Sequence, residues 1–234
     1  SSPVLLAALG VLSCSAGARA AAPDTPQWKC AKCPYPAGTQ GEVALGVGGV
    51  SDASTSFGDM TGLERDGAHL VLGGRVTLRG AGGYYADLAA ADLGLDSRSL
   101  WARSGREGMY SLSLGYDELP RRFTEGARTP FLGSGGSVLT LPAGFPAGTT
   151  TAMPLATTLQ PIEIGFDRSR FDLAGAWVAQ KDWTWRVALR RDVRDGTKPS
   201  SGSFFSTASL LPSPVDHTTD QLEASASYNS ARWQ

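Results

Sequence analysis

The residues whose types and spacing could support chemistry are two cysteines near the start of the chain. Cys30 and Cys33 form a C-x-x-C pattern, which can bind a metal, exchange disulfides or, when histidine follows, carry haem. Pro34 follows instead, so covalent haem attachment at this pattern is excluded. Metal binding is disfavoured because no second closely spaced Cys or His pair completes a tetrahedral site. A redox-active or assembly-related thiol pair, a structural disulfide and idle thiols remain as alternatives.

The other polar residues give weaker signals. His69 and His217 are isolated, which favours solvated side chains over metal ligands. Four aspartates lie in or beside one expected loop: Asp192, Asp195, Asp216 and Asp220. They could bind a hard cation such as calcium, but their irregular spacing favours a solvated loop.

A catalytic constellation is not expected. Glu163, Asp167 and Asp172 could be offered as an acid–base pair, but their strand-like spacing favours surface side chains without a catalytic role. The sequence shows neither a glycine-rich phosphate loop nor a nucleophile triad. We therefore expect no enzyme and no metal site.

The N-terminus indicates export. Residues 3–13 are apolar and precede two A-x-A cleavage patterns, which predicts a signal peptide over residues 1–22, incomplete at its start. Lipidation at Cys14 is disfavoured by a poor lipobox. Residues 23–40 would then be a periplasmic segment that carries the C-x-x-C pattern. A net charge of -1 gives no argument for nucleic acid, and no later stretch is long and apolar enough for a membrane helix.

Alternating side chains predict β-strands, and such strands would hold their polar side chains on one face. The clearest are residues 107–117, 170–179, 183–191 and 221–228, each about ten residues long, as in tilted membrane strands. In each, one face is apolar with aromatics near its ends, as in an interfacial girdle. The other is small or polar and suits a wet lumen. The partner-facing lumen candidates are Arg170, Asp172, Arg186 and Arg190.

The connections predict the fold. Weaker strands are expected at 42–50, 68–79, 84–93 and 98–103. Short connections at 80–83, 104–106, 180–182 and 229–232 alternate with long ones at 51–67, 118–161 and 192–220, with 94–97 as a short exception. This pattern predicts an all-β fold, a transmembrane antiparallel up-and-down β-barrel over residues 41–234 with its N-terminus in the periplasm. About eight strands would make only an open arc of a larger barrel, so we expect the chain to be the N-terminal part of a longer protein.

Several motifs, in order, resemble those of one family. They are the C-x-x-C pattern and residues 91–100, 114–120, 128–133, 139–142, 194–197 and 214–221. Each motif is weak, but their order over residues 28–234 resembles the MtrB/PioB family of decahaem-associated outer-membrane β-barrels.

The resemblance implies a non-enzymatic sleeve around a multihaem c-type cytochrome that conducts electrons across the outer membrane. The partner would carry the haem, and this chain would bind no cofactor of its own. Outward flow to metal oxides and inward flow from ferrous iron are both compatible with it. The alternatives are a general porin and, less favoured, a periplasmic β-sandwich binding protein with Cys30 and Cys33 as a disulfide.

Overall fold

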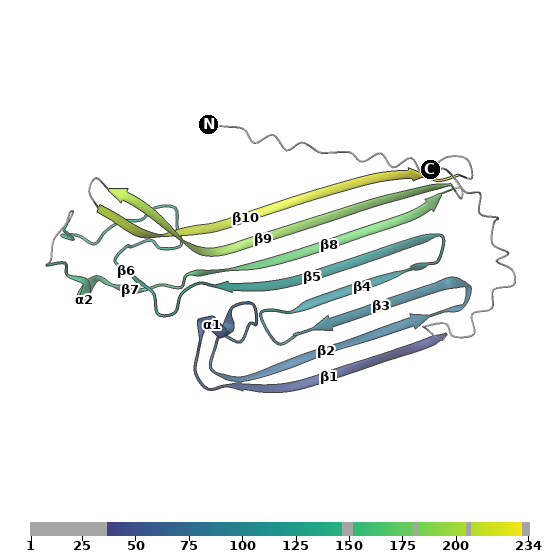
Figure 1. The fold of residues 1–234 in the computed structure, drawn as a ribbon, viewed down its shortest axis with the longest axis horizontal. Coiled ribbons are helices and arrows are strands. Elements are labelled where there is room, and N and C mark those ends of the chain that lie inside the picture. Colours follow the sequence, from purple (N-terminus) through teal and green to yellow (C-terminus); the bar gives the residue numbers. More distant parts are fainter. Residues whose placement is uncertain (1–36, 147–151, 180–181, 205–206, 231–234) are drawn as a thin grey trace, which may run out of the picture. The chain divides into compact units, whose positions relative to one another are not determined.

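A computed structural model describes residues 37–146, 152–179, 182–204 and 207–230. The signal peptide and C-x-x-C predictions lie outside these residues. Eight antiparallel strands form one sheet in the order β1-β2-β3-β4-β5-β8-β9-β10, so most neighbours in the chain are also neighbours in the sheet (Figure 1). The sheet is not closed on itself within the described residues. This is the predicted antiparallel, up-and-down order.

Each alternating segment overlaps one strand of the sheet, although β9 and β10 extend far beyond the predicted bounds. Their bounds are β1 Gly38–Val50, β2 Gly67–Arg79, β3 Tyr84–Ala91, β4 Ser99–Arg106, β5 Tyr110–Arg122, β8 Gly165–Ala179, β9 Trp183–Phe204 and β10 Thr207–Tyr228. A second small sheet pairs β6 (Arg128–Thr129) with β7 (Gln160–Pro161). The short helical turns are α1 (Thr55–Gly58), η2 (Ala81–Gly83) and α2 (Leu155–Thr158). Within the described residues, no helix is long and apolar enough to cross a membrane.

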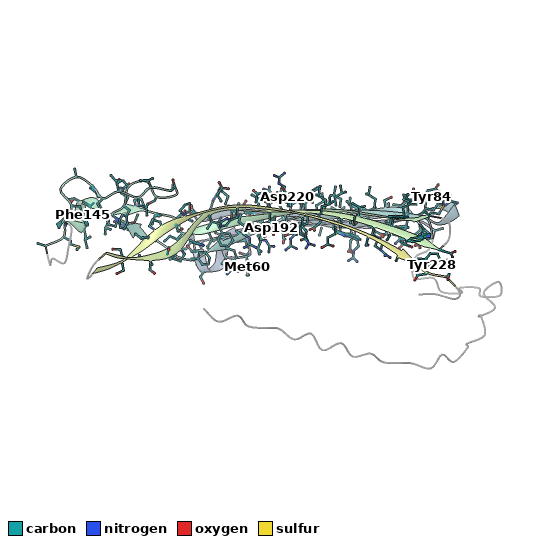
Figure 2. The ribbon with its side chains drawn as sticks, turned by 90° about the horizontal axis from the view of Figure 1, so that it is seen from above. Met60, Tyr84, Phe145, Asp192, Asp220 and Tyr228 are labelled. Atoms are coloured by element: carbon teal, nitrogen blue, oxygen red, sulfur yellow. The ribbon has the colours of Figure 1, made fainter. Side chains whose placement is uncertain are left out.

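Side-chain alternation divides the sheet into two faces, because successive residues of a strand point to opposite sides. The apolar face is the side that holds Leu112 of β5, and the polar face is the side that holds Ser113. Register carries this division across the sheet: Leu114 lies opposite Leu173, which lies opposite Leu189. Seen edge-on, side chains project from both sides of one layer of strands (Figure 2). Large side chains of the apolar face remain exposed, such as Leu222 at 72% and Val187 at 52%.

Aromatic side chains mark both margins of the apolar face. Trp183 packs with its ring centroid 5.1 Å from that of Tyr228 and 6.1 Å from that of Trp185. Tyr116 and Phe171 lie directly opposite each other toward the other margin. The predicted aromatic girdle is therefore present on this face.

Short and long connections gather at opposite ends of the strands. The short-turn end joins β2 to β3, β4 to β5 and β8 to β9, and the long-loop end joins β1 to β2, β3 to β4 and β5 to β8 (Figure 1). The β9–β10 hairpin also closes at the long-loop end, although β9 ends at Phe204 and β10 begins at Thr207. Three boundary predictions are wrong: residues 104–106 belong to β4, residues 118–122 continue β5, and residues 107–109, predicted as strand, form the turn between them. At the ends of β4 and β5, strand pairing extends three and five residues beyond the predicted bounds.

The predicted long loop at 192–220 is also wrong, because β9 and β10 pair continuously from Trp183–Tyr228 to Phe204–Thr207. The misleading signal was proline, which cannot donate to a β-ladder. Pro199 lies opposite Pro212, and Pro214 follows two residues later, so all three share one hydrogen-bonding parity. An antiparallel pair alternates between positions that exchange hydrogen bonds and positions that do not. Prolines confined to the positions that exchange none remove no hydrogen bond, so the ladder stays intact.

A compact cluster of loops covers the long-loop end of β5. The buried Arg122 guanidinium donates from Nε to Glu64 at 2.6 Å and from Nη1 to Asp167 at 2.8 Å. Asp59 accepts from the Arg122 backbone N–H at 2.9 Å and lies 3.2 Å from Arg121 Nε. Loop 51–66, which joins β1 to β2, is thereby held against β5, three strands farther along the sheet.

The opposite-face assignment predicts different tolerance of charge at adjacent positions of β9. We expect Val187→Arg in the full-length protein to cost about 2–4 kcal/mol, because it places a charge in the middle of the apolar face. Ala188→Arg should cost much less, because Ala188 lies opposite Glu223 on the polar face. Urea titration of the folded form, resolved by heat-modifiable gel mobility, measures both. Equal losses for the two variants would show that the faces are wrongly assigned.

Candidate functional site

The polar face is the candidate site, because strand register gathers its charged side chains there. Asp172 of β8 lies directly opposite Arg190 of β9, and Arg170 lies opposite Asp192. Arg186 shares this face four residues before Arg190 along β9. The four predicted lumen residues are therefore brought to one face, and Arg190 donates from Nε to Asp172 Oδ1 at 2.6 Å. Whether they contact a partner stays a prediction.

Asp192 is the centre of a cluster of arginines toward the long-loop end. It accepts from Arg168 Nε at 2.7 Å and from Arg194 Nε at 3.1 Å, and Arg170 Nε lies 3.8 Å away. Its side chain is 13% exposed. The hydrogen bonds from Arg168, against the opposing effect of burial, hold the pKa of Asp192 below its ordinary value. Asp192 is thus an anion that three cations compensate.

This geometry does not bring the calcium candidates together. Asp192 lies on the polar face, whereas Asp195, Asp216 and Asp220 have the opposite parity, and Asp195 lies directly opposite Asp216. Asp220 pairs with Arg191 at 3.4 Å. Among the described residues, no group of three or more His, Cys, Asp or Glu side chains is placed to hold a metal ion.

The remaining candidates are also separated. Asp167 and Glu163 both lie near the Arg122 guanidinium, at 2.8 and 3.6 Å, whereas Asp172 is on the other face of β8. His69 lies with Nε2 2.9 Å from the Arg65 carbonyl oxygen. His217 lies opposite Arg194. No acid–base pair arises from these described residues.

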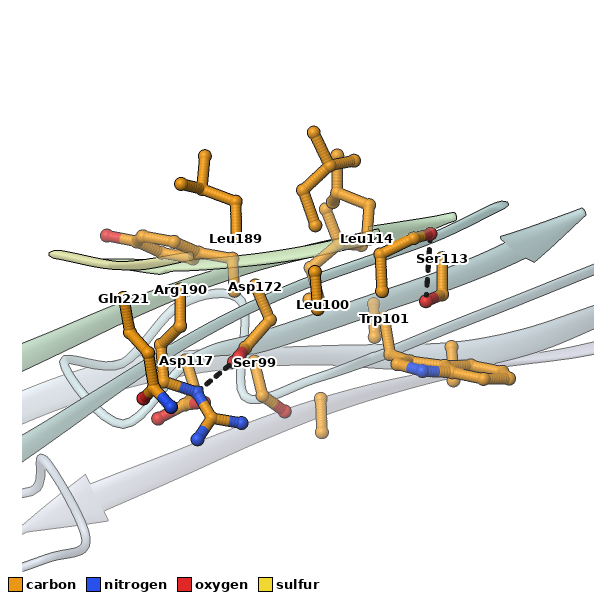
Figure 3. A pocket seen from close by; sticks show the side chains of 18 of the residues that line it. Ser99, Leu100, Trp101, Ser113, Leu114, Asp117, Asp172, Leu189, Arg190 and Gln221 are labelled. Carbon is orange, nitrogen blue, oxygen red and sulfur yellow. Dashed lines mark hydrogen bonds and ion pairs between the residues drawn. The ribbon is translucent and has the colours of Figure 1, made fainter. Parts of the chain in front are cut away.

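A shallow groove of about 560 Å³ crosses the polar face over β3, β4, β5, β8, β9 and β10. Figure 3 shows Arg190, Asp172, Asp117, Gln221, Ser99 and Trp101 on one side of the strands, and Leu100, Leu114 and Leu189 on the other. The groove therefore offers ion pairs, hydrogen bonds and the side chain of Trp101, a residue that is 45% exposed. Such a surface can bind a hydrated partner or line water.

Sequence reasoning missed Trp101, Arg168 and the role of Asp192. Arg168 could have been found by extending the alternation of β8 backward, because residues 168, 170 and 172 share a face. Trp101 was missed because the strand expected at 98–103 alternates too weakly for its faces to be assigned. Asp192 was placed in a loop, so its strand position opposite Arg170 was not foreseen.

Comparison with known proteins assigns this sheet to a family. Residues 50–234 match the family model described as "Putative outer membrane beta-barrel porin, MtrB/PioB". The chain belongs to the MtrB/PioB family. It is 33% identical over 208 residues to a protein of Shewanella baltica (strain OS185) named "Outer membrane protein MtrB". That match covers 88% of this chain and 30% of the relative.

Family membership places the protein in the outer membrane, in a porin-like class of β-barrels. The apolar face, with its aromatic margins, is then the face that meets lipid, and the polar face is the lumenal one. The fold, family and compartment predicted from the sequence are confirmed.

The Asp192 cluster predicts a specific loss of stability at low pH. Because the pKa of Asp192 is lowered on folding, its contribution is complete above the ordinary carboxyl value of about 3.9. The contribution is lost as pH falls through the lower pKa of the folded state. In the full-length protein, Asp192→Asn should cost about 1–2 kcal/mol at pH 7 and weaken the acid dependence. Urea titrations at pH 7 and below pH 4 measure both effects.

Asp220→Asn is the matched control, because the side chains of Arg191 and Asp220 are each 58% exposed. We expect it to cost about 0.5 kcal/mol or less, as exposed ion pairs contribute little. If both variants lost the same stability, the Asp192 cluster would have no special role.

Proposed function

We propose that this chain forms part of the wall of an outer-membrane barrel that houses and positions a multihaem c-type cytochrome for electron transfer across the membrane. The observation that carries the proposal is the concentration of arginine–carboxylate pairs on the lumenal face of an MtrB/PioB protein. The family resemblance implies the cytochrome as partner, and the haem would belong to that partner. The barrel would insulate and position it, with no catalytic step of its own.

The size of the sheet supports a wide lumen. Eight strands form a sheet that is open among the described residues, and the chain spans 30% of the length of its relative. Barrel diameter grows with strand number, so a wall with many more strands could enclose a folded protein. The long-loop end would face outward and the short-turn end the periplasm, as in other outer-membrane barrels.

The lumenal face supports a hydrated protein partner. Most of its charges are paired within the sheet, as in Asp172–Arg190 and Asp192–Arg168. Arg186, by contrast, has no carboxylate within 4.0 Å among the described residues. Its guanidinium is available to an acidic group of the partner, such as a carboxylate of the protein or a haem propionate.

The test is purification of the full-length protein from native membranes with its haem content recorded. We expect haem absorbance to co-purify, and Arg186→Gln to lower the retained haem about two- to fivefold at low salt, the effect of one exposed charge. Arg191→Gln, which removes a cation from the lipid face, is the control and should retain wild-type haem. A barrel that carries no haem partner from native membranes would overturn the proposal.

A general solute channel is the second candidate, favoured by the polar groove itself, since a surface that binds a hydrated partner can also line water. Planar-bilayer conductance separates the two. The sleeve predicts a pore that is blocked when the cytochrome is present, whereas a stable, wide pore in protein that never carries haem would favour the channel.

A further inference from the structure

The lipid-facing side of the sheet contains a second groove, which lies over β3 and β4 between walls from β2 and β5. Register places Leu78, Ala86, Ser104 and Leu112 in one row across these strands. The next row is Val76, Leu88, Ala102 and Leu114. Because Ala86, Ala102 and Ser104 are short, the floor at these positions lies below Leu78, Leu112 and Leu114, with Leu88 beside Ala102, and the open groove has a volume of about 370 Å³.

An arginine stands at the short-turn end of this groove. Arg106 lies opposite Tyr84 on one side and Tyr110 on the other, one row beyond Ser104. Its guanidinium carbon is 5.1 Å from the centroid of the Tyr84 ring, and its Nε donates to the Gly82 carbonyl oxygen at 3.0 Å. These contacts fix the guanidinium plane and leave its terminal nitrogens free to donate to another acceptor.

The charge of Arg106 is not compensated by the chain. No carboxylate lies within 4.0 Å of its guanidinium in the part of the protein that the structure describes. The arginines at the other margin of the same face differ, because Arg98 pairs with Glu118 at 2.6 Å and Arg191 with Asp220 at 3.4 Å. An anion would therefore be attracted to the lipid face at the short-turn margin.

We propose that Arg106 and this groove bind an anionic phospholipid of the inner leaflet, with the phosphate on the guanidinium and one acyl chain along Ser104 and Ala102. The short-turn end of outer-membrane barrels faces the periplasm, and tyrosines such as Tyr84 and Tyr110 mark the headgroup level. A guanidinium binds phosphate oxygens through charge-assisted hydrogen bonds. The site lies on the opposite face from the lumen and does not depend on the proposed cytochrome.

The test is native mass spectrometry of the full-length protein released from nanodiscs that contain phosphatidylglycerol and phosphatidylcholine in equal amounts. We expect wild-type protein to retain phosphatidylglycerol preferentially. Arg106→Gln should reduce that preference about fivefold, the effect of one basic side chain at an anionic surface. Arg106→Lys keeps the charge and should keep most of the preference.

Two further variants separate the headgroup from the groove. Ala102→Leu fills the floor and should lower retention of both lipids while Arg106 is intact. Arg191→Gln, which removes a paired arginine from the other margin, should leave the preference unchanged. Heat-modifiable gel mobility checks that every variant is folded. If Arg106→Gln is not folded, Ala102→Leu still tests the groove.

Three results would overturn the proposal. Wild-type protein could show no preference between the lipids, or Arg106→Gln could match Arg191→Gln. Glycerol phosphate, which has no acyl chain, could also displace phosphatidylglycerol while Ala102→Leu changes nothing; the site would then hold a phosphate without using the groove.

Discussion

The structure depends on an unbroken ladder of backbone hydrogen bonds between neighbouring strands. A single sheet has no second layer against which to bury side chains, and the buried hydrophobic residues among those described are Tyr85, Leu95, Ile164 and Val215. In lipid, each unsatisfied backbone group would cost several kcal/mol. Strand pairing is therefore what makes this sheet compatible with the membrane, and it continues from β1 to β10 without a gap.

The same pairing separates two environments across the thickness of one strand. Because side chains alternate, a lipid-facing row such as Leu114, Leu173 and Leu189 lies one residue from a lumenal row such as Gly115, Asp172 and Arg190. Register errors of one residue would exchange them, placing charges in lipid. The cross-strand pair of Asp172 and Arg190 favours the correct register, because a slip would separate the two.

Much of this arrangement could be predicted, because alternation is a local signal. Arg170, Asp172, Arg186 and Arg190 were placed on one face from two strands alone, and each of the eight strands overlaps a segment where alternation was seen. The stretch after Arg191 could not be read in this way. Beyond Arg191, both parities carry polar and charged side chains, such as Arg194 and Asp195, so apolar and polar residues no longer alternate although the backbone pairing continues.

Contacts between distant segments could not be predicted from the sequence for a different reason. Nothing near Glu64 indicates that it will meet Arg122, since ion pairs between loops depend on how the strands have already been arranged. The groove on the lipid face was hidden similarly: Ala86, Ala102 and Ser104 are unremarkable until register places them beside one another.

The clamp between loop 51–66 and β5 has a consequence for the order of folding. Glu64 and Arg122 are 58 residues apart, and the strands between them are β2, β3, β4 and β5. The β1–β2 hairpin can form early from local contacts, but its loop can reach its final position only after β5 has been added. Closing so long a chain segment is slow relative to pairing adjacent strands. We therefore expect docking of this loop to be a late event that reports completion of the first five strands.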